Sequence, residues 1–348
     1  MAKPLVSAAR LAQSGFLETG VARSLRATPA GAIDVGARWG VDELFRLTPS
    51  LFHPIAVEPD PEEAARVADR ERDTSWAGFD LCTDALGARD GTGRLNLLKR
   101  ANNSSLYPVD PRAAQRYHLA GFELVRTLDV ALRPLDDVVF KDFQSLGHAG
   151  EIIKLDVQGA EADVIAGAKR TLRERTVGLI CEVHFLAAYE GIALFSDIER
   201  EMRALGFAFY GFLDFQHRST KRLDKTQHRG LERMMQADAV FFRDPFGGTD
   251  AKLERHRIEA LLLTALLLGY FDFGLELTEL LPSAEQAAMQ TTLRALARID
   301  GAEDQADIQA LLRAAADGAS EAHVALSRMV DKRRDLTTVH DIAPVRKP

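Results

Sequence analysis

Apolar runs of strand length alternate with amphipathic, helix-like segments through most of this chain of 348 residues. A helix between two strands carries the chain back across the sheet, so such strands run parallel and helices cover both faces of the sheet. The alternation therefore predicts an α/β, doubly wound fold. The runs that carry the strands are residues 32–40, 53–60, 76–87, 94–100, 122–132, 152–161, 176–185, 207–215 and 237–244.

The two ends of the chain have a helical rather than an alternating pattern. Towards the C-terminus, Ile308, Leu311, Leu312 and Ala315 form an apolar stripe at i, i+3, i+4, i+7 spacing. Such a helical region is either a partner-binding or dimerisation module or an appendage that packs on the catalytic domain. The expected limits are a lead-in at 1–28, an α/β domain at 29–245, a helical region at 250–335 and a tail at 336–348.

Composition excludes some classes of partner and location. The chain has 44 basic and 51 acidic side chains, which argues against nucleic acid as the main partner. Both cysteines, Cys82 and Cys181, lie in apolar runs and are expected to be buried free thiols in a reducing compartment. The first residues lack a secretory pattern, and the longest apolar stretch, 258–271, is too short to span a bilayer. We therefore expect a cytoplasmic protein.

The strand-like run at 152–161 places charged residues inside an apolar segment. In an extended chain Lys154, Asp156 and Gln158 share one face. A buried charge must be paired, liganded or neutralised, and ligands bind at the carboxyl ends of strands in open α/β sheets. The run predicts either a structural ion pair or a functional site centred on Asp156.

A second pattern indicates an adenosine-containing cofactor. Asp34, Gly36 and Gly40 follow one strand, and Glu58 ends the next strand. Glycines let the backbone approach a ligand, and a carboxylate at that place accepts the ribose hydroxyl hydrogens. A dinucleotide-binding motif would need a third glycine, and Asp34 would repel a pyrophosphate. Asp34 instead suits the ammonium and sulfonium charges of S-adenosylmethionine, although the glycines alone could also form an ordinary tight turn.

Several motifs in this order resemble the FkbM family of S-adenosylmethionine-dependent methyltransferases over roughly residues 32–215. The motifs are IDVGARWG, AVEPDP, ALGARDGTGRLNL, NNSSL, RTLDVAL and IIKLDVQGAEADVIAGA. The resemblance implies a class I methyltransferase, Rossmann-like sheet of about seven strands with the last antiparallel. It also implies O-methylation of a hydroxyl on a sugar, a glycan or a related secondary metabolite. Family members often carry glutamate at the position of Gln158, so a catalytic role of that position is in doubt.

The resemblance also assigns cofactor contacts, position by position. Residues after the first strand would line the methionine end of the cofactor, those after the second strand would bind the ribose, and those after the third would flank the adenine. The residues concerned are Asp34, Gly36, Ala37, Arg38 and Gly40 at the first strand, Glu58 and Pro59 at the second, and Asp84 and Ala85 at the third.

Methyl transfer to an alcohol needs a base or a metal that lowers the pKa of the hydroxyl. The candidates are Asp156, Glu161, Glu182 and His184, with His184 slightly favoured as the base. Glu182 and His184 share one face of a strand, and with Asp156 they could also bind a divalent metal. In the alternative reading His184 is a core histidine bonded to Glu182, and Glu161 only complements a helix dipole.

Two polar segments are candidates for substrate binding. Asn102, Asn103, Ser104 and Ser105 match a family motif and carry amides and hydroxyls that suit sugar hydroxyls. The basic segment 217–230 could receive an anionic acceptor, such as a phosphorylated sugar, or could be a solvated loop.

Two competing functions remain at this level. One is a nicotinamide-dependent sugar-modifying enzyme, which the ribose-binding carboxylate alone supports. The other is a non-catalytic module that acts in assembly through its helical C-terminal region, as a homo-oligomer or with a protein partner.

Overall fold

The computed structural model describes residues 6–223, 230–247, 253–298, 308–309, 311–313 and 315–316. The chain divides into two compact units, one of Met1–Arg222 with Gly230–Ala297 and one of Leu223–Arg229 with Arg298–Pro348. In the second unit Ile308, Leu311, Leu312 and Ala315 are helical.

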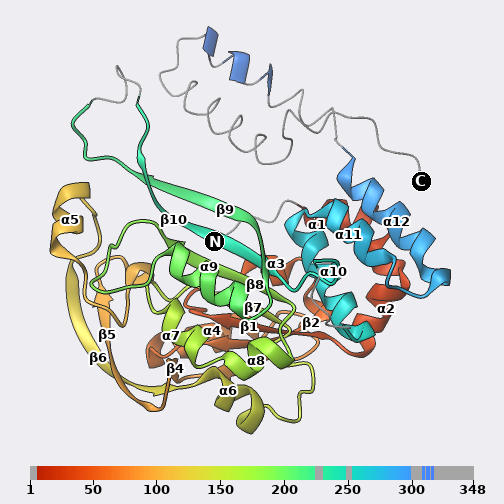
Figure 1. The fold of residues 1–348 in the computed structure, drawn as a ribbon, viewed down its shortest axis with the longest axis horizontal. Helices are drawn as coiled ribbons and strands as arrows, with labels where there is room; N and C mark the ends of the chain where they lie inside the picture. The colour runs from red at the N-terminus through yellow and green to blue at the C-terminus, as the bar shows by residue number, and fades with distance from the viewer. Residues whose placement is uncertain are drawn as a thin grey trace. The chain divides into compact units, whose positions relative to one another are not determined.

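A seven-stranded sheet runs through the first unit in the order β3-β2-β1-β7-β8-β10-β9 (Figure 1). The last strand of the chain, β10, pairs antiparallel with both of its neighbours, and the pairs from β3 to β8 are parallel. The expected fold class is therefore confirmed. The strands are β1 (Ala30–Val35), β2 (Phe52–Val57), β3 (Asp80–Cys82), β7 (Ile152–Leu155), β8 (Gly178–His184), β9 (Ala208–Arg218) and β10 (Arg233–Phe242).

The first five α-helices begin at residues whose side chains cap them. In α4, for example, Asp60 caps the first turn, Pro61 is the first helical residue, and Glu62 and Glu63 complement the positive end of the helix dipole. The α-helices are α1 (Ala8–Gln13), α2 (Gly20–Ala27), α3 (Glu43–Arg46), α4 (Pro61–Glu71), α5 (Pro111–Tyr117), α6 (Leu135–Asp137), α7 (Glu161–Ala166), α8 (Lys169–Glu174), α9 (Phe195–Ala204), α10 (Arg255–Leu268), α11 (Phe271–Thr278) and α12 (Ser283–Ala297).

Alternating residues of the strands enter two separate cores, one on each face of the sheet. Ile33 and Val35 of β1 pack with side chains of α6, α7, α8 and α9. Ala30 and Ala32 pack on the other face with side chains of α1, α2, α3, α10, α11 and α12. This two-sided burial explains why the strands read as nearly continuous apolar runs.

Helix α10 lies against the sheet rather than beyond it. It is buried along Ile258–Leu268, where it contacts β1, β7 and α2. Its one buried charge, Glu259, accepts hydrogen bonds from Ser24 at 2.7 Å and Arg255 at 2.7 Å. The limits predicted at residues 28 and 245 thus fall inside one compact unit, since helices from both ends of it cover the same face of the sheet. A separate role for the helical region stays a prediction.

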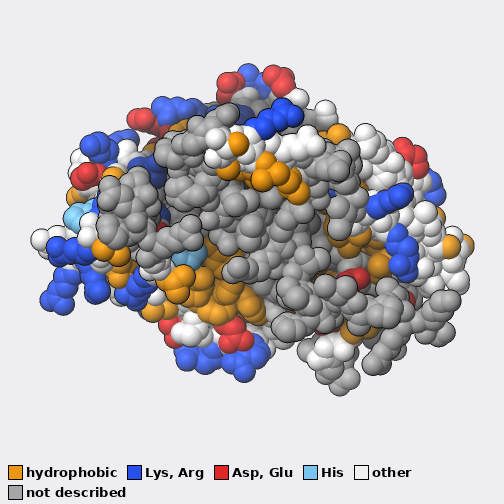
Figure 2. Space-filling model, turned by 90° about the horizontal axis from the view of Figure 1, so that it is seen from above, with side chains coloured by type: hydrophobic (Ala, Val, Ile, Leu, Met, Phe, Trp, Pro, Cys, Tyr) orange, Lys and Arg blue, Asp and Glu red, His pale blue; other side chains and the backbone are white. Residues whose placement is uncertain are grey.

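The predicted strand at 76–87 is wrong as a single strand. Only β3 joins the main sheet, and the chain then turns away, so that β4 (Ala85–Leu86) pairs with β6 (Leu124–Arg133). The predicted runs at 94–100 and 122–132 do form strands, but β5 (Gly91–Leu98) and β6 make a second, three-stranded sheet with β4. Basic side chains gather at the left edge of Figure 2, on the side that carries α5, β5 and β6 in Figure 1.

Two expectations from composition can be compared with the structure. Cys82 and Cys181 are buried free thiols, as predicted. Among the described helices, none is long and apolar enough to cross a membrane.

Candidate functional site

A cavity of about 330 Å³ opens at the carboxyl ends of β1, β2 and β7. The strand order reverses between β1 and β7, and such a switch point is where open α/β sheets bind ligands. Twelve of the predicted site residues line it: Asp34, Gly36, Arg38, Gly40, Glu58, Pro59, Ala85, Asn102, Asn103, Ser104, Asp156 and Glu182. Five do not: Ala37, Asp84, Ser105, Glu161 and His184.

The loop after β1 passes very close to β7. Gly36 has a φ of +94°, and a Cβ atom at this position would lie 2.1 Å from the backbone oxygen of Asp156. Only glycine fits there. This contact fixes the distance between the β1 loop and the end of β7, the two walls of the cavity.

Asp34 is a buried carboxylate with one unused oxygen. Its Oδ2 accepts a hydrogen bond from the backbone N–H of Asp42 at 2.8 Å, whereas Oδ1 has no hydrogen-bond partner. Burial raises the pKa of Asp34 to about 7, against the opposing effect of Lys154. The unused oxygen and the raised pKa mark a place where a ligand cation would be stabilised.

Glu58 follows β2 and is also buried. Its carboxylate accepts a hydrogen bond from the backbone N–H of Asp60 at 2.9 Å, and burial raises the pKa of Glu58 to about 7. Arg38 forms ion pairs with Asp60 at 3.3 Å and with Glu63 at 3.4 Å. These ion pairs connect the loop after β1 with the segment after β2. Glu58 faces the cavity between them.

The residues after β3 divide between the cavity and the surface. Ala85 and the following Leu86 line the cavity. Asp84 instead forms an ion pair with Arg133 at 3.0 Å, and Arg133 also binds Asp142. Asp84 therefore braces the second sheet in this structure.

Asp156 sits at the end of β7 and is held by a buried lysine. Lys154 Nζ lies 3.3 Å from Asp156 Oδ2 and 3.9 Å from Asp42 Oδ2. Burial opposes the charged form of Asp156, but Lys154 and the hydrogen bond from Gln158 outweigh it, so the pKa of Asp156 lies below its usual value. The Asp156 side chain is 26% exposed and lines the cavity. It is thus a carboxylate ready to accept a hydrogen bond from a ligand.

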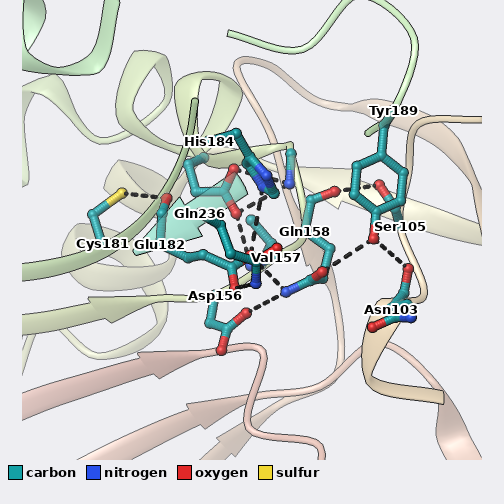
Figure 3. A network of polar contacts seen from close by, with 12 residues as sticks. Asn103, Ser105, Asp156, Val157, Gln158, Cys181, Glu182, His184, Tyr189 and Gln236 are labelled. Atoms are coloured by element: carbon teal, nitrogen blue, oxygen red, sulfur yellow. Dashed lines mark hydrogen bonds and ion pairs between the residues drawn. The ribbon is translucent and has the colours of Figure 1, made fainter. Parts of the chain in front are cut away.

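Gln158 is the hub of the polar network behind the cavity (Figure 3). Its Nε2 donates to Asp156 Oδ1 at 2.9 Å and to Glu182 Oε2 at 2.6 Å. The Tyr189 hydroxyl donates to Gln158 Oε1 at 3.0 Å, and Ser105 Oγ donates to the Gln158 backbone oxygen at 2.7 Å. Sequence reasoning missed this role. Its only signal was that Gln158 shares a strand face with Asp156.

Glu182 and His184 project from β8 into the same network but differ in access. Glu182 lines the cavity and accepts from Gln236 Nε2 at 2.5 Å as well as from Gln158. Burial raises the pKa of Glu182 well above its usual value. His184 is 1% exposed, and burial lowers the pKa of His184 to about 4. It is a neutral imidazole behind the cavity wall at neutral pH.

Glu161 is the first residue of α7, and its side chain stabilises the chain reversal between β7 and this helix. Its carboxylate accepts from the backbone N–H groups of Val157 at 3.0 Å and of Gly159 at 2.9 Å. Burial raises the pKa of Glu161 to about 7. Ligand atoms of Glu161, Glu182 and His184 lie within 4.8 Å of one another. In the described part of the chain, Glu161 thus takes the place in this group that the sequence reading had given to Asp156.

The predicted substrate segment lies beside the cavity, partly in a short 3-10 turn, Ala101–Asn103. Asn102, Asn103 and Ser104 line the cavity, and the Asn103 amide nitrogen is buried without a hydrogen-bond partner. Ser105 Oγ accepts from the backbone N–H of Tyr107 and faces the network instead. Of the basic segment 217–230, Arg218 lines the cavity, and residues 224–229 lie outside the described residues.

Comparisons with known proteins identify the family of the chain. We find no curated protein that matches the sequence. Among solved structures, the crystal structure of magnesium protoporphyrin IX methyltransferase from Synechocystis PCC 6803 with bound SAM has 13% identity and a TM-score of 0.28, over 66% of this chain and 79% of that chain. The Methyltransferase FkbM domain matches residues 34–209, about half of the chain, from β1 into β9. The chain therefore belongs to the FkbM family of methyltransferases.

Proposed function

We propose that this methyltransferase uses S-adenosylmethionine to methylate a hydroxyl of a sugar, a glycan or a related secondary metabolite. The observation that carries the proposal is the Asp156 carboxylate at the end of β7. It is charged, faces the cavity and lies beside the β1 loop that suits the cofactor. The opposite wall carries Asn102, Asn103 and Ser104, whose polar groups suit a hydroxyl-rich acceptor.

The residues of the β1 and β2 loops fit this cofactor. Asp34 offers its unpartnered oxygen to the ammonium group, and Glu58 offers its carboxylate to the ribose hydroxyls. A dinucleotide would bring a pyrophosphate to the same loop, where Asp34 and Asp42 would repel it. When bound, S-adenosylmethionine supplies an electrophilic methyl group.

Asp156 orients the acceptor. Its carboxylate accepts a hydrogen bond from the acceptor hydroxyl and takes up the proton that the oxygen loses when the new carbon–oxygen bond forms. Lys154 and Gln158 keep Asp156 fixed, so little reorganisation is needed. His184 was slightly favoured as the base from the sequence, but it does not line the cavity. We therefore propose that Asp156, not His184, contacts the hydroxyl group of the acceptor.

The acceptor side of the cavity favours a negatively charged acceptor. Arg100 and Arg218 line it, and the Arg100 side chain is exposed. Basic side chains also gather at the left edge of Figure 2, on the side of α5, β5 and β6. A phosphate or carboxylate on the acceptor would be attracted to the guanidinium groups of Arg100 and Arg218.

The test begins with binding of S-adenosylmethionine and S-adenosylhomocysteine by calorimetry. Glu58→Ala should weaken binding at least tenfold, whereas Glu62→Ala, on an exposed side chain of the neighbouring helix, should not change it. No binding by the unmodified protein would overturn the proposal.

The second step is a screen of sugars, phosphorylated sugars and glycans with isotopically labelled cofactor. NMR of the product should place the methyl group on oxygen. Asp156→Asn should lower turnover while cofactor binding stays within a few-fold of normal. A product methylated on nitrogen, carbon or sulfur would contradict the proposal.

A further inference from the structure

Three potential metal ligands meet behind the cavity wall. Glu161 reaches this place from α7, and Glu182 and His184 come from β8; we call these three residues the rear cluster. Their ligand atoms lie within 4.8 Å of one another, and all three side chains are buried. Figure 3 shows Glu182 and His184 side by side next to Gln158.

His184 has no hydrogen-bond partner among the described residues. Its side chain is 1% exposed, and neither Nδ1 nor Nε2 makes a hydrogen bond there. The carboxyl group of Glu182 lies beside the ring, with Oε2 3.5 Å from Nε2. Buried polar atoms in folded proteins are almost always satisfied, so an imidazole with two orphaned nitrogens beside two carboxylates points to a missing ligand.

The carboxyl groups of the rear cluster are bonded to neutral donors. Among the described residues, Glu161 accepts hydrogen bonds from backbone N–H groups alone, and Glu182 accepts them from the side-chain amides of Gln158 and Gln236. Within the described residues, no lysine or arginine pairs with either carboxylate, and the buried Lys154 pairs with Asp42 and Asp156.

We propose that the rear cluster binds one divalent first-row transition-metal ion, such as Zn²⁺ or Mn²⁺, through Glu161, Glu182 and His184. One imidazole nitrogen with two carboxylate oxygens suits such an ion better than Mg²⁺ or Ca²⁺, which prefer oxygen ligands alone. Because Glu182 lines the cavity, the ion would reach the rear cluster through the cavity, past the Glu182 side chain.

The geometry needs a modest adjustment. Zinc binds nitrogen and carboxylate oxygen at about 2.0–2.2 Å in a tetrahedral arrangement, so two of its ligand atoms lie about 3.3–3.6 Å apart. The donors of the rear cluster, which now lie within 4.8 Å of one another, reach this spacing when their side chains move by about 1 Å. The bound ion would hold Glu182, and through Gln158 it would support Asp156. In this site the ion is a positioning element, not a contact of the acceptor.

The experiment uses the full chain, stripped with a chelator and titrated with Zn²⁺ alone and with Co²⁺ alone. Calorimetry should give one ion per chain, the visible bands of Co²⁺ should show nitrogen and oxygen ligation, and Zn²⁺ should raise the melting temperature. His184→Leu and Glu182→Gln should each weaken binding at least about 100-fold and abolish the shift in melting temperature.

Two control variants test the assignment. His148→Leu removes another buried ring nitrogen without a partner among the described residues, and Asp156→Asn removes the carboxylate that the sequence grouped with Glu182 and His184 as a candidate ligand. Both should bind Zn²⁺ normally. Failure of the unmodified chain to bind either ion would overturn the proposal, and so would full binding by both His184→Leu and Glu182→Gln. Because no step uses cofactor or acceptor, this result is independent of the proposed function.

Discussion

The side-chain amide of Gln158 lies 2.9 Å from the carboxylate of Asp156 and donates a hydrogen bond to it. The same nitrogen donates to Glu182 at 2.6 Å, so one neutral side chain separates two carboxylates. Gln158 has a φ of +56°, an unusual backbone conformation for a residue with a side chain. The turn after β7 accepts this conformation because both ends of the Gln158 side chain are bonded. The position of Asp156 thus depends on a residue whose chemistry is not catalytic.

Replacing Gln158 with glutamate tests this dependence. The change removes the donor and places a third carboxylate between Asp156 and Glu182, so we expect lower stability and lower turnover. The loss of stability should be about 1–3 kcal/mol at pH 8 and smaller at pH 6, where the new carboxyl is protonated and donates again. Chemical unfolding at both pH values measures it. Gln115→Glu, on the exposed side of α5, is the control. An equal loss at the two pH values would contradict the prediction.

Stability of the ligand-free protein should fall as the pH rises from 5.5 to 7.5. Burial raises the pKa values of Asp34, Glu58, Glu161 and Asp238 to about 7, whereas their ordinary values are 3.8 or 4.5. Between the two values the folded state holds more protons than the unfolded state, so the folded form loses stability until the pH passes 7. The pKa of His184 is lowered from its ordinary value of 6.5 to about 4, so this residue makes stability rise with pH, but only below pH 6.5.

The same groups predict a pH-dependent cofactor affinity. Asp34 and Glu58 must be charged to hold the ammonium group and the ribose, so binding releases protons below pH 7 and weakens there by up to about tenfold per pH unit for each group. Calorimetry in two buffers of different ionisation enthalpy counts the protons released. Affinity that is constant from pH 5.5 to 8 would contradict the raised pKa values.

The alternation of strands and helices could be predicted from the residues because burial on both faces leaves continuous apolar runs. The expectation of about seven strands with the last antiparallel came only from the family resemblance, and the order of the strands was not predicted, because periodicity carries no information on which strands pair. The run at 76–87 was misjudged because its two halves, Asp80–Cys82 and Ala85–Leu86, pair with different sheets, and pairing partners cannot be read from a single strand.

Most of the predicted site residues line the cavity, and many of them could be predicted because they directly follow strands. The network behind them could not. Tyr189 and Gln236 reach Gln158 and Glu182 from distant parts of the chain, and Glu161 joins His184 only because the chain turns sharply at Gln158 and Gly159. The alternation of side chains along the strands led us to expect Asp156 beside Glu182 and His184 as a candidate metal ligand. In the structure the turn at Gln158 and Gly159 brings Glu161, not Asp156, to these two residues.

Lys154 should be one of the most sensitive positions of the sheet. Its Nζ is the buried cation beside Asp156 and Asp42, and Lys154→Met leaves these carboxylates without it. Removing one partner of a buried ion pair costs about 3–5 kcal/mol. The pKa of Asp156 should rise, so the acidic limb of the activity profile moves to higher pH. Lys141→Met, which removes an exposed ion pair with Asp137, should leave unfolding and the profile unchanged. Equal effects of both variants would contradict this reading.

Gly36 should tolerate no side chain, because its backbone is left-handed and because it lies very close to the backbone of Asp156. Gly191 has the left-handed backbone without the close contact, so it tests the first reason alone. Gly36→Ala places a methyl group at a φ of +94° and 2.1 Å from the backbone oxygen of Asp156, whereas Gly191→Ala has a φ of +75° and meets no atom within 4 Å. The left-handed backbone alone costs about 1–2 kcal/mol, so Gly191→Ala should lose that amount and keep cofactor affinity. Gly36→Ala must also push the β1 loop away from β7, which displaces Asp34 from Asp156 and should abolish cofactor binding. Thermal unfolding and calorimetry on both variants measure the difference. If Gly36→Ala binds the cofactor as Gly191→Ala does, the close contact between the β1 loop and β7 does not shape the site.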